Sequence, residues 1–176
     1  MLLAGCGNSR TPVPSLSGAA QPHGFHRLVY PAAGVTIRVP RNWSSASERA
    51  PLVATVGSGA AIVALWRFPR REPPPAGAAA LAGAGVKLLD AARARDASLQ
   101  VIGSKAMRID HAPAIELDAR ERVGGQLRRV RSLHLFVAGA ELVLEQYAPP
   151  GIFRDIDHAV FSPVRRSLRL LAPPGA

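Results

Sequence analysis

The sequence of 176 residues contains a single cysteine, Cys6, and only 5% of its residues are aromatic. One cysteine excludes an internal disulfide framework and a cysteine-rich zinc site. No apolar run approaches the roughly 18 residues of a membrane-spanning helix. The longest run, residues 60–66, predicts a buried strand instead. The length predicts one domain, large enough to be stable without covalent cross-links.

Lysine is almost absent: only Lys87 and Lys105 occur among the 22 lysine and arginine residues. These basic residues outnumber the 12 acidic ones and give a net charge of +10. The charge is not accompanied by a zinc finger, a recognition helix or a stacking-aromatic motif. We therefore expect no nucleic-acid partner. The excess of arginine is typical of a solvated basic surface, and it would also suit anionic lipid headgroups or acidic wall polymers as partners.

The N-terminus resembles a bacterial lipobox, because Leu3-Ala4-Gly5 precedes Cys6 and a Gly/Ser/Pro-rich stretch follows it. In such a motif the cysteine receives a diacylglyceryl group and becomes the new N-terminus. We therefore expect residues 1–5 to be the remnant of a signal peptide and Cys6 to carry a lipid. Residues 6–24 are then expected to form a flexible tether on the outer face of the bacterial plasma membrane.

Residues 25–171 carry the periodicity of a single folded domain, followed by a disordered tail over residues 172–176. Alternating apolar residues predict strands near 27–39, 52–68 and 99–147, and an apolar stripe predicts a helix over 77–95. A closing helix is expected from about residue 152 to residue 170. Strands joined by short turns make an antiparallel sheet. Two amphipathic helices therefore predict an α/β/α sandwich around a sheet of six to eight strands.

A two-residue turn at Gly124-Gly125 predicts the register of one hairpin. Asp118 then faces Arg131, whereas Arg120 directly opposes Arg129, which is unfavourable unless an anion lies between them. We call five residues the arginine hairpin and treat it as a candidate site for an anion or a partner protein: Arg120, Arg122, Arg128, Arg129 and Arg131.

The segment from Gly34 to Trp43 resembles the opening of PsbP-like proteins, in which a strand is followed by Pro-x-x-Trp. Further similarities are the paired strands through 131–136 and 142–144 and a closing helix with Phe161-x-Pro163. The resemblance covers nearly all of residues 25–171. This family includes bacterial lipoproteins of the LpqN type. The resemblance implies an antiparallel sheet between helices, and binding or scaffolding roles rather than catalysis.

No catalytic, metal-binding or cofactor-binding motif is found. The five histidines lack a metal-binding spacing, and His134 is expected to be a hydrogen-bonded sheet residue. The leading hypothesis is a non-catalytic, lipid-anchored accessory module of the cell envelope. A carrier of a small apolar or anionic ligand, bound near Trp43 and Trp66, is the alternative. A hydrolase with an unrecognised site is the third. A hydrophobic cavity would favour the carrier, and a convergent nucleophile and base would favour the hydrolase.

Overall fold

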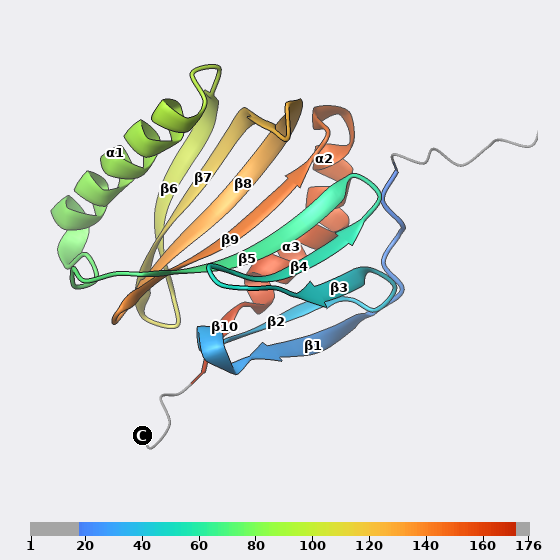
Figure 1. The fold of residues 1–176 in the computed structure, drawn as a ribbon, viewed down its shortest axis with the longest axis horizontal. Coiled ribbons are helices and arrows are strands. Elements are labelled where there is room, and N and C mark those ends of the chain that lie inside the picture. The colour runs from blue at the N-terminus through green and yellow to red at the C-terminus, as the bar shows by residue number, and fades with distance from the viewer. Residues whose placement is uncertain (1–17, 172–176) are drawn as a thin grey trace, which may run out of the picture.

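The computed structural model describes residues 18–171. Two antiparallel sheets and two helical layers form the domain (Figure 1). The predicted lipidation site Cys6 and the predicted tail at 172–176 lie outside the described residues. The expected antiparallel sheet between helices is confirmed, with a second, smaller sheet added to it.

The large sheet contains seven strands in the order β3-β4-β5-β9-β8-β7-β6. Adjacent strands are antiparallel throughout. The strand bounds are β3 Ser44–Ser47, β4 Leu52–Ser58, β5 Ala61–Pro69, β6 Gln100–Ile109, β7 Ala112–Val123, β8 Gln126–Val137 and β9 Ala140–Ala148. The pairing of β5 with β9 joins the strands before the long helix to those after it, and so makes one continuous sheet.

The small sheet has the order β1-β2-β10, with bounds β1 Phe25–Tyr30, β2 Val35–Pro40 and β10 Arg169–Leu170. A short 3-10 turn, η1 (Pro31–Ala33), joins β1 to β2. We expected the closing helix to continue to residue 170. The structure corrects this, because the helix ends at Ser167 and the next residue, Leu168, is extended and buried. The chain then pairs with β2.

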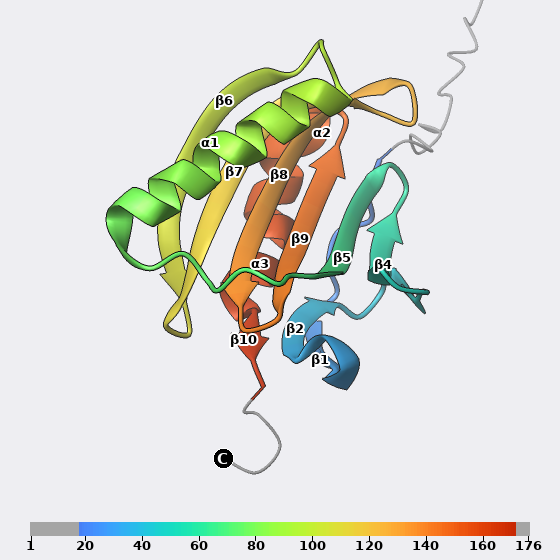
Figure 2. The ribbon, with the colours of Figure 1, turned by 60° about the vertical axis from the view of Figure 1, so that its left-hand side comes forward.

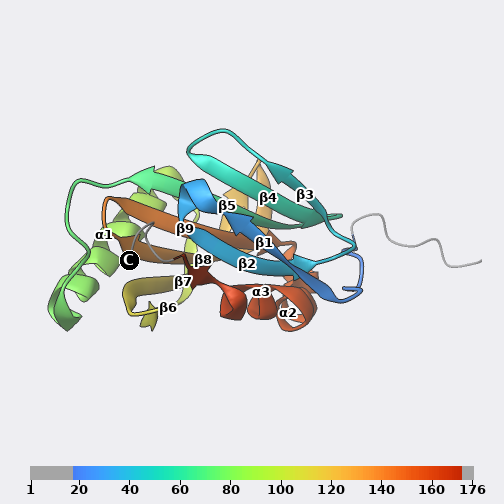
Figure 3. The same ribbon diagram turned by 90° about the horizontal axis from the view of Figure 1, so that it is seen from below.

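Helices cover both faces of the large sheet, as Figures 2 and 3 show. The long helix α1 (Gly77–Arg95) lies on one face. The opposite face carries α2 (Pro150–Ile156) and α3 (Ser162–Ser167), which are joined by a wider helical turn, η2 (Asp157–Phe161). The main hydrophobic core lies between the two sheets and the α2–α3 layer, and includes Phe153 and Phe161, both fully buried.

The predicted turn at Gly124-Gly125 is confirmed. Gly124 and Gly125 have positive φ angles of 58° and 77°, as a two-residue hairpin turn of this kind requires. The turn fixes the register of β7 on β8, so that Asp118 pairs with Arg131 and Arg120 pairs with Arg129, as expected.

The segment that we expected to be a tether is attached to the domain at its C-terminal end. The indole N–H of Trp43 donates to the Ala20 carbonyl at 3.0 Å. The side chain of Asn42 accepts from the backbone N–H of His23 at 2.9 Å and donates to the Gln21 carbonyl at 2.8 Å. The ordered domain therefore begins several residues before the predicted boundary at residue 25. No sequence pattern predicts these contacts, because the segment lacks apolar periodicity.

Candidate functional site

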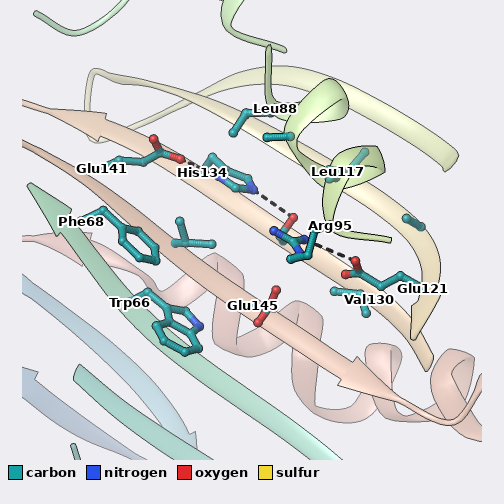
Figure 4. Close-up of a pocket in the computed structure, with 15 residues that line it drawn as sticks. Trp66, Phe68, Leu88, Arg95, Leu117, Glu121, Val130, His134, Glu141 and Glu145 are labelled. Carbon is teal, nitrogen blue, oxygen red and sulfur yellow. Dashed lines mark hydrogen bonds and ion pairs between the residues drawn. The ribbon is translucent and has the colours of Figure 1, made fainter. Parts of the chain in front are cut away.

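Helix α1 covers its face of the sheet without packing tightly against it. Of its 19 residues only Ala92 is buried, and Val86, which we expected on the apolar stripe, is 57% exposed. A pocket of about 320 Å³ lies between α1 and strands β5, β7, β8 and β9 (Figure 4). We call it the α1 pocket. Its volume lies at the lower end of the range of about 300–1,000 Å³ that is typical of small-molecule sites.

One wall of the α1 pocket is aromatic. Trp66 and Phe68 lie two residues apart on β5 and therefore point to the same face of the sheet. Their rings are nearly parallel, at an angle of 9° and a centroid separation of 6.0 Å. Leu117, Val143 and Leu88 add aliphatic surface from β7, β9 and α1. The pocket can thus accommodate an apolar group, and its indole face can attract a cation.

Three carboxylates enter the same pocket from two strands: Glu121 on β7, and Glu141 and Glu145 on β9. Glu121 pairs with Arg95 of α1 at 3.3 Å. Glu141 contacts the Nδ1 atom of His134 at 2.7 Å, and a guanidinium nitrogen of Arg70 lies 3.8 Å from its other oxygen. Two of the three carboxylates therefore have a basic partner within the fold.

Glu145 differs from the other two carboxylates because no ion pair to it occurs within the described part of the chain. Burial raises the pKa of Glu145, and the negative charge of Glu121 raises it further. Arg95, His134 and the indole N–H of Trp66 act in the opposite direction but are outweighed. The charged form of Glu145 is therefore poorly stabilised by the protein's own groups, and a cation bound beside it would stabilise that form.

A chain of hydrogen bonds runs along the floor of the α1 pocket (Figure 4). The Nδ1 atom of His134 contacts Glu141 at 2.7 Å, and the Nε2 atom contacts the hydroxyl oxygen of Ser132 at 3.1 Å. The expectation that His134 is a hydrogen-bonded sheet residue is confirmed. The order of the groups is also that of a nucleophile, a base and an orienting acid.

The sequence contained one unused signal for this pocket. Glu141 and Glu145 alternate with Val143 on a strand that sits near the middle of the sheet, so their side chains face the α1 layer. Acidic residues at alternate positions of a covered strand indicate a polar cavity on that face. The residues 18–171 contain no group of three or more His, Cys, Asp or Glu side chains arranged to hold a metal ion.

The two tryptophans do not share a pocket. Trp66 lines the α1 pocket, whereas Trp43 is 4% exposed and lies in the core on the other side of the large sheet. There its ring contacts Phe161 edge to face, with centroids 6.4 Å apart. Of the two tryptophans expected to line a ligand pocket, only Trp66 therefore lines this one. Trp43 follows β2 of the small sheet and packs in the core against the α2–α3 layer, whereas Trp66 points from β5 towards α1.

The arginine hairpin is also arranged differently from the expectation. Although Arg129 opposes Arg120 in register, its guanidinium turns to Asp118, with two hydrogen bonds of 3.0 and 2.9 Å. Arg131 bonds to Asp118 at 2.5 Å and to Asp157 of η2 at 2.6 Å. Both guanidinium groups lie over the Phe153 ring. No anion is needed to relieve the opposition of Arg120 and Arg129, because Arg129 pairs with Asp118 instead.

Arg165 of α3 extends this arrangement, since it pairs with Asp157 at 2.8 Å and with Glu116 at 3.2 Å. Burial opposes ionisation of Asp118, but hydrogen bonds from Arg129 and Arg131 outweigh it and lower the pKa of Asp118. Arg129 and Arg131 therefore attach the helical layer to the sheet. Of the other members of the hairpin, Arg122 donates to the Gly125 carbonyl, Arg128 donates to Gln126, and Arg120 is exposed.

Comparison of the sequence finds no matching family model and no matching curated protein. Comparison of the fold finds similar solved structures. The cyanobacterial PsbP protein CyanoP from Synechocystis sp. PCC 6803 has a TM-score of 0.63 at 13% identity, and the match covers 96% of this chain and 98% of that chain. LpqN of Mycobacterium tuberculosis is described as involved in cell envelope biogenesis. It has a TM-score of 0.52 at 15% identity, and the match covers 78% of this chain and 83% of that chain.

A third similar structure is a protein of unknown function from Pseudomonas aeruginosa, described as a putative regulator. It has a TM-score of 0.53 at 15% identity, and the match covers 86% of this chain and 99% of that chain. At these identities the matches establish the fold alone. The fold is PsbP-like, as the resemblance of the sequence predicted.

Within residues 18–171, no helix has the length and apolar character needed to cross a membrane.

Proposed function

We propose that this chain is a non-catalytic accessory protein of the bacterial cell envelope, and that it binds an amphipathic cation in the α1 pocket. The observation that carries the proposal is Glu145, a half-buried carboxylate without an ion-pair partner among the described residues, inside a pocket with an aromatic wall. Similarity to LpqN, which is described as acting in cell envelope biogenesis, supports the envelope setting.

The charge of the α1 pocket favours a cation over the anionic ligand considered from the sequence. Glu121 is neutralised by Arg95, and Glu141 is neutralised in part by Arg70 and contacts His134. Glu145 remains, and an ammonium group beside it would form an ion pair in a site of low polarity. The stacked rings of Trp66 and Phe68 offer an apolar surface to the rest of such a ligand, and the indole face attracts the cation itself.

The test uses the full chain carrying Cys6→Ser and three probes with the same decyl chain below their micelle concentrations: decyltrimethylammonium, decanol and decyl sulfate. Isothermal calorimetry should show binding of the ammonium compound at least tenfold tighter than binding of the other two. Glu145→Gln should lower the affinity for the ammonium probe about tenfold and leave decanol binding unchanged. Glu48→Gln, an exposed change of equal charge, is the matched control.

The affinity of the ammonium probe should rise with pH. The pKa of Glu145 is raised, so its carboxyl is protonated over a wider acidic range than usual, and only the ionised form pairs with a cation. If decyl sulfate binds as tightly as the ammonium compound, or if Glu145→Gln binds both alike, the α1 pocket does not select cations.

We further propose that the protein stays at the membrane through a lipid on Cys6, because Leu3-Ala4-Gly5-Cys6 resembles a lipobox. With a complete signal sequence supplied upstream, the wild-type chain should fractionate with membranes and incorporate labelled fatty acid. Cys6→Ser should lose both properties. Membrane retention of the Cys6→Ser chain equal to that of the wild type would contradict lipid anchoring.

The contacts between Ser132, His134 and Glu141 favour a second candidate function, hydrolysis of an ester. In that reaction the Ser132 oxygen attacks the acyl carbon while His134 accepts its proton and returns it to the leaving alcohol, and water then cleaves the acyl-serine. The backbone N–H groups of β8 cannot serve as donors to the developing oxyanion, because β8 is hydrogen-bonded to β7 and β9. The donor in this reaction would be Arg95, which lines the same pocket. Labelling of wild type, but not of Ser132→Ala, by a fluorophosphonate would establish this function over non-catalytic binding. Absence of labelling would exclude a serine hydrolase.

A further inference from the structure

A second group of arginines lies where the small sheet meets the C-terminal end of α3, away from the α1 pocket. Arg27 of β1, Arg38 of β2, Arg166 of α3 and Arg169 of β10 line a surface hollow of about 490 Å³ together with Thr36 and Ser167. We call these four residues the arginine hollow. Figure 3 shows β2 lying beside α3, and β1 and β10 pair with β2, so that the four arginines come together from separate elements.

The arginine hollow lacks the acidic partners that neutralise the arginine hairpin. Within residues 18–171 the guanidinium groups of Arg27, Arg38 and Arg166 make no ion pair. Arg169 lies 3.9 Å from Asp110, and it also donates to the Arg166 and Leu168 carbonyls. The hollow itself is lined by no carboxylate.

The pairing of the small sheet places like charges together. Arg27 and Arg38 are directly opposed across β1 and β2, and directly opposed like charges destabilise a sheet. Ser167 holds this arrangement in place, because its hydroxyl accepts the backbone N–H of Arg38 at 2.7 Å and donates to the Val164 carbonyl at 2.7 Å. The fold thus fixes the strand and the helix end that carry the arginines, and among residues 18–171 only Asp110, beside Arg169, supplies a counter-charge.

An exposed apolar side chain accompanies the arginine hollow. Val29 lies two residues after Arg27 on β1, so both side chains point to the same face of the strand. Val29 is 49% exposed, and all four arginines are exposed as well. A basic surface with an adjacent exposed apolar residue suits the boundary between lipid headgroups and acyl chains.

We propose that the arginine hollow is a docking surface for the phosphate groups of anionic phospholipids. Guanidinium groups bind phosphate with paired, charge-assisted hydrogen bonds. An open surface with four arginines fits several headgroups of a membrane better than one enclosed anion. The hollow lies on the small sheet and α3, whereas the α1 pocket lies on the opposite face of the large sheet, so a ligand in the pocket and a membrane at the hollow do not compete for residues.

The test is vesicle co-sedimentation of the full chain carrying Cys6→Ser, so that no lipid anchor contributes. Vesicles containing phosphatidylglycerol should bind the protein in a salt-sensitive manner, and vesicles of pure phosphatidylcholine should not. The triple variant Arg27→Gln/Arg38→Gln/Arg166→Gln should reduce the partition coefficient about a hundredfold, since each arginine near an anionic surface contributes about a factor of five. The matched control is Arg49→Gln/Arg71→Gln/Arg120→Gln, which removes the same charge from exposed arginines elsewhere.

A reduction confined to the first triple variant supports the proposal, provided that both variants keep the circular dichroism spectrum and melting temperature of the parent. Equal loss in both triple variants would overturn it, because net charge alone would then explain binding. Binding of inorganic phosphate to the parent without any binding to phosphatidylglycerol vesicles would also overturn it, since the hollow would then be a site for a free anion. Because the assay requires neither Cys6 nor the α1 pocket, its outcome is independent of the proposed function.

Discussion

Replacement of Arg131 by glutamine tests whether the arginine hairpin is an anion-binding site or attaches the helical layer to the sheet. If the hairpin were a solvated anion site, Arg131→Gln would alter binding and leave stability unchanged. In the structure the Arg131 side chain is 13% exposed and bonds to Asp118 at 2.5 Å and to Asp157 at 2.6 Å. Its removal leaves Asp118 with Arg129 and Asp157 with Arg165, so each carboxylate loses one of two cationic partners.

The expected cost follows from these two contacts. A hydrogen bond to a charged group contributes about 1.5–3 kcal/mol, and removing one partner of a buried ion pair costs about 3–5 kcal/mol. Glutamine can replace one donor, and the remaining arginines share the uncompensated charge. We therefore expect a loss of about 2–4 kcal/mol in the free energy of unfolding. For a domain of this size that corresponds to a melting temperature lower by about 5–15 °C.

The assay is urea unfolding of the full chain carrying Cys6→Ser, followed by circular dichroism at neutral pH. Arg120→Gln is the control, because Arg120 directly opposes Arg129 but is exposed, and its loss should change stability by no more than about 0.5 kcal/mol. Equal stability of the two variants would refute the argument that Arg131 attaches the helical layer to the sheet.

The pH dependence gives a second check on the same interaction. The pKa of Asp118 is lowered in the folded protein, so its stabilising effect is present above the ordinary aspartate pKa and is lost as pH falls through the lowered value. The stability difference between wild type and Arg131→Gln should therefore persist at neutral pH and shrink in strong acid. A difference that does not change down to the acid transition would show that Asp118 is not the partner that matters.

Two further predictions concern other parts of the domain. Glu145→Gln should raise stability at neutral pH and remove part of the decline of stability with rising pH, because a carboxyl group with a raised pKa stabilises the fold only while it is protonated. Urea unfolding between acidic and neutral pH measures this, and an unchanged slope of unfolding free energy against pH would contradict it. Asn42→Ala should lower the free energy of unfolding by about 1–3 kcal/mol, because the Asn42 side chain makes hydrogen bonds with residues 21 and 23. Thermal unfolding measures this, and an unaltered melting temperature would mean that residues 19–24 do not attach to the domain.

The sequence by itself determined the local structure, because strands and tight turns depend on residues that are close together in the chain. Alternation of apolar and polar residues located most strands, and Gly124-Gly125 fixed the register of β7 on β8, including the pairing of Asp118 with Arg131. The PsbP-like fold class also followed from the sequence through its resemblance to the family. The lipidation of Cys6 remains a prediction, because the residue lies outside those that the structure describes.

Tertiary structure decided where the chemistry lies, because the strand order and the packing of helices bring together residues far apart in the chain. Asp157 meets Arg131 only because α2 and η2 fold back over β8. Trp43 and Trp66 are separated by the large sheet, whereas Trp66 meets Glu145 because β5 pairs with β9. The four residues of the arginine hollow converge from β1, β2, α3 and β10, and no local pattern of charge or hydropathy encodes that meeting.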